Sequence, residues 1–236
     1  MRKQFDVRTC DSDVTGSLSL EELLMHMQEA AGDDSHYLGF GKDKVFDQGY
    51  RWVISRTAAK VLRMPKYGER VEIITVAEPN KMFFYPRFTA LRTIDGELLL
   101  ESETVWAIID FKTRKPTLPK QTGIIIKQSE EVEKELSIET KIPLIETTET
   151  LDRTVLFSDL DINGHMNNTK YVAWAYDLLG SEYLKGKQLA DFRLSYHAEA
   201  KEGEIITQKF SKKEKELYVI GVVGERKVYE IYLKFE

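Results

Sequence analysis

Two 20-residue stretches of the chain match each other, and this internal repeat limits the folds open to it. Asp13–Gly32 falls on Asp161–Gly180 with a shift of 148 positions, and the shift makes Gly16 coincide with Gly164. Apolar residues meet apolar residues along both stretches: Val14 and Ile162, Leu18 and Met166, Leu23 and Tyr171, Leu24 and Val172, Ala31 and Leu179. Self-similarity of this kind indicates a duplicated structural unit.

Each stretch has the pattern of a polar turn followed by a buried helix. In the first, Ser19 and Glu22 have the spacing of a capping box, and Gly32 marks the expected end of the helix. In the second, Gly180 is the expected end. The apolar positions recur with a helical period: Leu20, Leu23, Leu24, Met27 and Ala31 in the first, and Tyr171, Val172, Ala175, Leu178 and Leu179 in the second.

The segments that follow each helix have the pattern of β-strands. Gly68 falls on Gly203 with a shift of 135, which predicts that the loop after the first helix is 13 residues longer than its counterpart. Asp95-Gly96 is a strong hairpin signal. Strands are expected at Arg2–Thr9, Trp52–Arg63, Val71–Ala77, Phe83–Ile94 and Glu97–Phe111, and at Leu189–Ala200, Ile205–Thr207, Lys209–Phe210, Leu217–Val223 and Val228–Phe235.

These patterns predict an α+β fold built from two tandem units, each an antiparallel sheet wrapped around one helix. We expect an N-terminal unit over residues 1–128, a connecting segment over 129–149 and a C-terminal unit over 150–236. The connection is rich in Glu and Lys, with a short helix expected at Glu130–Leu136. Joining the two sheets edge to edge would remove exposed strand edges.

Composition excludes several classes of function. The 236 residues carry a net charge of -5, which disfavours nucleic acid as the main partner. Cys10 is the single cysteine, so no internal disulfide is expected, and no cluster has the spacing of a zinc site. No glycine-rich phosphate loop occurs, so we expect no nucleotide cofactor. The first ten residues lack an apolar segment, so we expect no secretory signal and a cytoplasmic protein.

The loop before the second helix gathers the residues suited to catalysis. Asp161, Asn163 and His165 lie in it, and Glu199 lies on a later strand. The repeat places Thr15 on Asn163, Ser17 on His165 and Met64 on Glu199, while Asp13 matches Asp161. If these residues served only the fold, there would be no reason for one copy alone to carry the polar and titratable side chains. The alternative is that these are turn and cap residues free to vary, above all Asp161.

The tandem layout, with Asp161-x-Asn163-x-His165-x-Asn167-Asn168 opening the second helix, resembles the acyl-acyl carrier protein (acyl-ACP) thioesterases. The resemblance covers nearly the whole chain and implies two hotdog units in tandem. It implies Asp161, Asn163, His165 and Glu199 as catalytic residues. Many plant members carry a cysteine just after the glutamate, where this chain has Ala200, so a Cys–His scheme has no thiol here. Plant members also have a plastid transit peptide, and its absence favours a bacterial version.

The resemblance further implies hydrolysis of fatty acyl-ACP to free fatty acid, which ends chain elongation. The acyl tail would lie in the first unit against Leu20, Leu24 and Met27, although ordinary core duty is the alternative for each. Backbone N–H groups at Asn167–Thr169 could hold the oxyanion. Acyl carrier protein is the expected partner, docking on a basic patch, and a homodimer stays open. Two patches are candidates: Arg114, Lys115 and Lys120, or Lys209, Lys212, Lys213 and Lys215.

Other functions remain open on the sequence alone. One is a different hotdog enzyme, either a thioesterase for acyl-coenzyme A or a hydratase for enoyl thioesters. Another is a non-catalytic binder of acyl thioesters. Direct attack by water and an acyl-enzyme intermediate on Asp161 or Glu199 are also both open.

Overall fold

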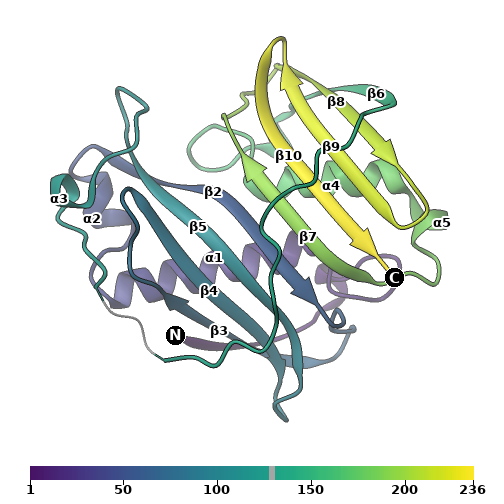
Figure 1. Cartoon of the computed structure of the whole chain (residues 1–236), viewed down its shortest axis with the longest axis horizontal. Coiled ribbons are helices and arrows are strands. Elements are labelled where there is room, and N and C mark those ends of the chain that lie inside the picture. Colours follow the sequence, from purple (N-terminus) through teal and green to yellow (C-terminus); the bar gives the residue numbers. More distant parts are fainter. Residues whose placement is uncertain (128–130) are drawn as a thin grey trace.

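The computed structural model describes residues 1–127 and 131–236 of the chain. Within these residues, ten strands form one antiparallel sheet (Figure 1). The N-terminal half supplies β1 (Arg2–Asp6), β2 (Tyr50–Val61), β3 (Arg70–Ala77), β4 (Phe84–Thr93) and β5 (Leu98–Asp110). The C-terminal half supplies β6 (Glu149–Thr154), β7 (Leu189–Tyr196), β8 (Ile205–Lys212), β9 (Glu216–Val223) and β10 (Arg226–Phe235).

The strand order repeats itself in mirror image about the middle of the sheet. The order is β1-β3-β4-β5-β2-β7-β10-β9-β8-β6, so each strand of one half has a counterpart in the other. The halves join where β2 pairs with β7, with Arg56 opposite Ser195 and Lys60 opposite Asp191. The expected edge-to-edge union of the two sheets is therefore confirmed.

Hydrogen bonds confirm both shifts of the repeat. Leu18 N–H donates to Pro65 O at 2.8 Å, and Met166 N–H donates to Ala200 O at the same distance. The first residues of these pairs are 148 positions apart and the second residues 135. The alignment of Met64 with Glu199 thus describes equivalent places in the two halves.

Two long helices lie on the same face of the sheet and contact each other (Figure 1). In α1 (Leu20–Tyr37), the hydroxyl of Ser19 accepts the N–H of Glu22, which confirms the predicted start. In α4 (Asn168–Leu179), Gly180 ends the helix as expected. The predicted apolar stripes of both helices are buried, at about 1.5–3 kcal/mol for each large side chain.

The prediction that α1 ends at Gly32 is wrong, because the helix continues to Tyr37. A glycine costs only about 1 kcal/mol inside a helix. Tertiary contacts offset this cost, since Asp34 in the last turns forms a buried ion pair with Arg87 of β4 at 2.7 Å.

The strand expected over Leu189–Ala200 ends earlier, at Tyr196, so Glu199 lies in a loop and not on a strand. After Tyr196, the N–H groups of His197 and Ala198 both donate to Val228 O, which turns the chain out of the ladder.

The connection between the halves contains no helix over its described residues 131–136. Residue 130 of the helix expected at Glu130–Leu136 lies outside the described residues. Val132 and Leu136 pack against Phe88, Ala90 and Leu98, while buried Glu101 accepts the N–H groups of Glu135 and Leu136. These contacts, in place of helical hydrogen bonds, hold the segment against the sheet.

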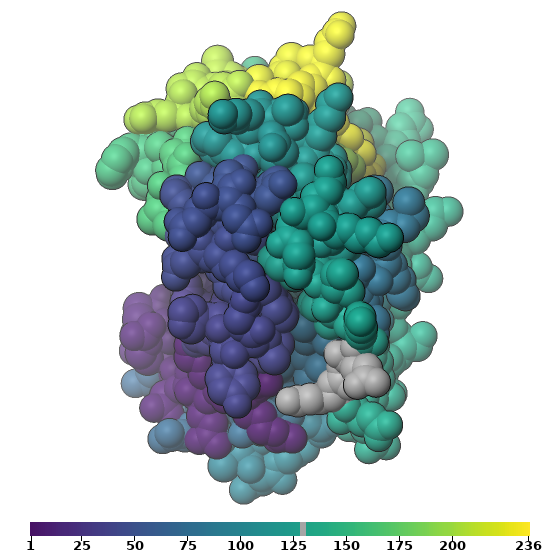
Figure 2. Space-filling model, turned by 90° about the vertical axis from the view of Figure 1, so that its left-hand side faces the viewer, coloured from purple at the N-terminus to yellow at the C-terminus, as the bar shows by residue number. Residues whose placement is uncertain are grey.

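Short helices lie in the loops: α2 (Lys42–Phe46), α3 (Pro119–Thr122) and α5 (Ser181–Leu184). The segments around α2 and α3 lie side by side at one end of the molecule (Figure 2). Beneath them, Val45 and Ile124 pack with Tyr85 and Ile108 in a separate apolar cluster. None of the described helices is both long and apolar enough to cross a membrane.

Candidate active site

A tight turn before α4 fixes the direction of His165. The Asp161 carboxylate accepts the N–H of Asn163 at 2.8 Å, the N–H of His165 at 3.3 Å and the side-chain amide of Asn163 at 3.1 Å. Gly164 has a φ of 74°, in the left-handed region that glycine adopts without strain. Asp161 therefore holds the turn, and its carboxylate is occupied by the loop itself.

His165 and Glu199 meet across this turn. His165 Nε2 lies 3.3 Å from Glu199 Oε2, with side-chain exposures of 18% and 37%. Two arginines hold the Glu199 loop: Arg114 contacts the carboxylate and Arg226 donates to the Glu199 carbonyl. The structure thus brings together Asp161, Asn163, His165 and Glu199, with the last two close enough to share a proton.

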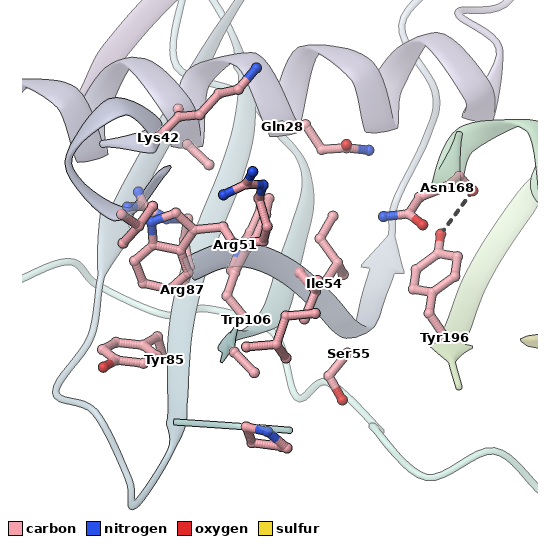
Figure 3. A pocket seen from close by; sticks show the side chains of 18 of the residues that line it. Gln28, Lys42, Arg51, Ile54, Ser55, Tyr85, Arg87, Trp106, Asn168 and Tyr196 are labelled. Atoms are coloured by element: carbon pink, nitrogen blue, oxygen red, sulfur yellow. Dashed lines mark hydrogen bonds between the residues drawn. The ribbon is translucent and has the colours of Figure 1, made fainter. Parts of the chain in front are cut away.

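The first turn of α4 offers fewer free donors than the sequence suggests. Asn167 caps the helix, because its side-chain oxygen accepts the N–H of Thr169 at 3.0 Å and its carbonyl accepts that of Lys170. Among the described residues, we find no acceptor for the N–H of Asn168. Tyr196 donates its hydroxyl to Asn168 O at 3.1 Å, which holds the following Asn168–Thr169 peptide at the start of α4 (Figure 3).

A cleft of about 880 Å³ extends from this polar cluster into the N-terminal half. Figure 3 shows part of its lining, with Gln28 reaching in from α1, and Tyr85 and Tyr196 at opposite sides of the view. Much of the lining is aromatic or aliphatic, as a hydrocarbon chain requires: Phe40, Val45, Trp52, Ile54, Phe83, Phe84, Tyr85, Trp106, Ile109 and Ile126.

None of the three residues expected to contact an acyl tail lines the cleft itself. Leu20, Leu24 and Met27 are buried in the main core. Only Leu24 and Met27 border a void of about 10 Å³ beside the cleft. The face of α1 that lines the cleft itself carries Gln28, Ala31, Gly32 and Ser35.

Arg114, which the sequence suggested for a docking patch, lies at the site itself. It follows β5 in a turn where Thr113 N–H donates to Asp110 Oδ1 at 2.7 Å, and its own φ is 58°. A non-glycine residue in this region is uncommon. In the sequence, Arg114 is marked only by the polar turn Asp110–Lys115. That pattern does not predict a contact with Glu199, 85 positions away.

His197 also lines the cleft, and burial lowers its pKa. Its Nε2 lies 3.6 Å from Glu230, which also binds Lys227. Within the described residues, no three His, Cys, Asp or Glu side chains gather as metal ligands would.

Two domain models of one family together match most of the chain. The acyl-ACP thioesterase N-terminal domain matches residues 1–142, and the C-terminal domain matches residues 142–228. A chloroplastic acyl-(acyl-carrier-protein) hydrolase of Cuphea viscosissima is 26% identical over 221 residues, covering 84% of this chain and 52% of that protein. The chain spans about half the length of the curated relatives it matches.

Solved structures extend the similarity to the whole chain. A crystal structure of an acyl-ACP thioesterase from Bacteroides thetaiotaomicron is 29% identical, with a TM-score of 0.84, and the match covers 100% of this chain and 97% of that one. A putative oleoyl thioesterase from Lactobacillus plantarum is 25% identical, with a TM-score of 0.82 and coverage of 100% and 95%.

The mirrored sheet, its two long helices and the polar cluster at the cleft define a tandem hotdog protein with a candidate active site. The chain belongs to the acyl-ACP thioesterase family.

Proposed function

We propose that this protein hydrolyses the thioester of fatty acyl-ACP, releasing free fatty acid and ending chain elongation. The observation that carries the proposal is the contact between His165 and Glu199 at 3.3 Å. At the equivalent place in the other half, Ser17 accepts a hydrogen bond from Lys66 and Met64 carries no titratable group. Of these two equivalent places, the one in the C-terminal half therefore carries an acid–base pair, and the names of the relatives supply the reaction.

Glu199 serves as general base in this proposal and removes a proton from an attacking water. His165 orients that water or shares the proton, and Asn163 holds the water or an amide of the pantetheine arm. The N–H of Asn168 is the backbone donor open to the oxyanion, and loss of one such donor typically costs about 3–4 kcal/mol. The leaving thiol has an ordinary pKa of about 8.5 and needs little help from an acid.

The two halves have separate duties in the proposal. The N-terminal unit, residues 1–128, holds the acyl chain in the cleft beneath α1, and the C-terminal unit, residues 150–236, supplies the catalytic residues. The aromatic lining of the cleft supports this division, because each buried methylene of a substrate gains about 0.8 kcal/mol. The length of the cleft then sets the preferred chain length.

Acyl carrier protein is the proposed partner, in a bacterial cytoplasm. Arg114 already pairs with Glu199, so the neighbouring Lys115 and Lys120 are the better docking candidates. Lys115 follows Arg114 on the loop after β5, and Lys120 lies in α3 just beyond it, near the cleft that a carrier arm has to enter.

The test is turnover of purified acyl-ACP, with free thiol measured by colour reaction and the released acid by mass spectrometry. The proposal expects thiol and free fatty acid in equal amounts, faster than from acyl-coenzyme A. Hydration of a crotonyl thioester without thiol release would favour a hydratase. Tight binding of acyl-ACP with no thiol release would favour a binder.

A further inference from the structure

One wall of the cleft carries a buried donor that the proposed reaction does not use. The indole Nε1 of Trp106 on β5 is shielded from solvent and has no acceptor among the described residues. The neighbouring Trp52 differs, because its Nε1 donates to Phe40 O at 3.2 Å. An unpaired buried N–H costs about 1–3 kcal/mol. We therefore expect the Trp106 N–H to meet an acceptor on a bound ligand.

The Trp106 indole borders a small niche that adjoins the cleft. The niche is the void of about 10 Å³ and is lined by Gln28, Ile54, Thr57, Arg87, Thr104 and Trp106, among others. Gln28, Arg87 and Trp106 also line the main cleft (Figure 3). Its volume is that of about one oxygen-sized group.

The charges around the niche are balanced, which limits the ligand to a neutral acceptor. Arg87 Nη1 donates to Asp34 at 2.7 Å and to Thr75 at 3.2 Å, so its charge already has a buried partner. Thr104 donates to Thr57 at 3.3 Å. A hydroxyl or ketone oxygen accepts a hydrogen bond here without adding charge, whereas a carboxylate would be buried without its own counter-ion.

Tyr196 places the niche near the reacting end of the cleft. Its ring borders the niche, and its hydroxyl donates to Asn168 O at the start of α4. On the other side of the niche, Trp106 packs against the separate apolar cluster of Val45, Tyr85, Ile108 and Ile124, which lies toward α2 and α3. The niche thus lies between the start of α4 and this cluster, and an oxygen in it belongs to the part of the acyl chain between the thioester and that cluster.

We propose that the Trp106 niche binds a hydroxyl or keto oxygen on the acyl chain, so that the preferred substrates are oxygenated acyl thioesters. The proposal rests on the proposed function and names its substrate class. A plain hydrocarbon leaves the Trp106 N–H unpaired, whereas an oxygen near the thioester accepts it.

The kinetic test compares kcat/KM for a 3-hydroxyacyl-ACP and the saturated acyl-ACP of the same length. The wild type is expected to prefer the hydroxylated substrate, and Trp106→Phe lowers that ratio by about tenfold. Trp174→Phe is the matched control and leaves the ratio unchanged, because its N–H is bound to Asp159 and Trp174 is not among the residues that line the cleft or the niche. An unchanged ratio in Trp106→Phe overturns the inference and indicates that the niche holds water only.

A second measurement does not depend on turnover or on a variant. The chain has 3 tryptophans, so its ¹⁵N-labelled indole spectrum has three signals. A non-hydrolysable 3-hydroxyacyl thioether of pantetheine is expected to shift the Trp106 signal downfield, and the saturated thioether is not. Equal shifts from both compounds overturn the inference. Failure of the wild type to release thiol from either carrier substrate counts instead against the proposed function.

Discussion

Arg114 and Glu199 form an ion pair between the two halves of the repeat. Arg114 comes from the turn after β5 in the N-terminal half, and Glu199 from the loop after β7 in the C-terminal half. The carboxylate that His165 contacts is thus oriented by a residue from the other half. The N-terminal half, which has Ser17 and Met64 in place of His165 and Glu199, thus contributes to the site through this contact as well as through the cleft.

Arg114→Ala is expected to lower kcat by about tenfold with little change in thermal stability. Glu199 loses a partner that fixes its rotamer, while the exposed pair contributes at most about 1 kcal/mol to folding. Steady-state hydrolysis of acyl-ACP and a melting curve check both points. Arg2→Ala, which removes an exposed pair with Glu72, is the control. Wild-type kcat in Arg114→Ala would show that Glu199 needs no such support.

Asp34→Ala is expected to lower the free energy of unfolding by about 3–5 kcal/mol, because it leaves Arg87 buried and unpaired. Burial already lowers the pKa of Arg87. Urea unfolding measures the loss. The double variant Asp34→Leu with Arg87→Leu should recover most of it, since apolar groups can replace a buried pair. A loss below about 1 kcal/mol in the single variant would mean that the pair is hydrated.

Acid stability of the N-terminal half depends on Asp11. Arg8 donates to both carboxylate oxygens, at 2.8 and 2.9 Å, and these hydrogen bonds lower the pKa of Asp11 to about 2 from 3.8. Since the folded pKa lies below the unfolded one, the stabilisation is present above pH 4. It is lost as the pH falls toward 2.

Asp11→Asn is therefore expected to be about 2 kcal/mol less stable than wild type at neutral pH. The difference should shrink between pH 4 and 2, as followed by urea unfolding at each pH. Arg8→Ala should show the same convergence. A constant difference across that range would mean that Asp11 titrates normally in the folded protein.

Two glycines give opposite predictions for substitution by alanine. Gly32 lies inside α1 with open space around it, so Gly32→Ala should stabilise the fold by about 0.5–1 kcal/mol. At Gly221 on β9 an added methyl would overlap the ring of Tyr229, whose hydroxyl accepts a hydrogen bond from Gln208 at 2.7 Å. Gly221→Ala should destabilise by about 1–3 kcal/mol. Melting temperatures that move in the same direction for both variants would contradict these placements.

Local patterns were enough to predict most of the architecture. The apolar stripes of α1 and α4 recur every three or four residues, and the two turns match each other through Gly16 and Gly164. The end of α1 could not be predicted in this way. The ion pair between Asp34 and Arg87, 53 positions away, stabilises the helix beyond Gly32, and a local sequence pattern does not predict that contact.

The site shows the same limit. Comparing the two halves singled out His165 and Glu199, because their counterparts Ser17 and Met64 cannot act as an acid–base pair. It could not find Arg114, whose role depends on a turn of unusual φ aimed at the other half. The apolar pattern of α1 suggested the face with Leu20, Leu24 and Met27 for the acyl tail, whereas the cleft is lined by the face with Gln28, Gly32 and Ser35, which no apolar pattern marks.

The central claim is that one half alone performs the chemistry, with Glu199 as base and His165 as its partner. The most direct measurement is kcat for acyl-ACP hydrolysis by Glu199→Gln and His165→Ala, beside Ser17→Ala and Met64→Leu at the equivalent positions. The account predicts losses of about 10²–10⁴-fold for the first two, with wild-type melting temperatures, and near wild-type rates for the last two. Wild-type turnover by folded Glu199→Gln would contradict it.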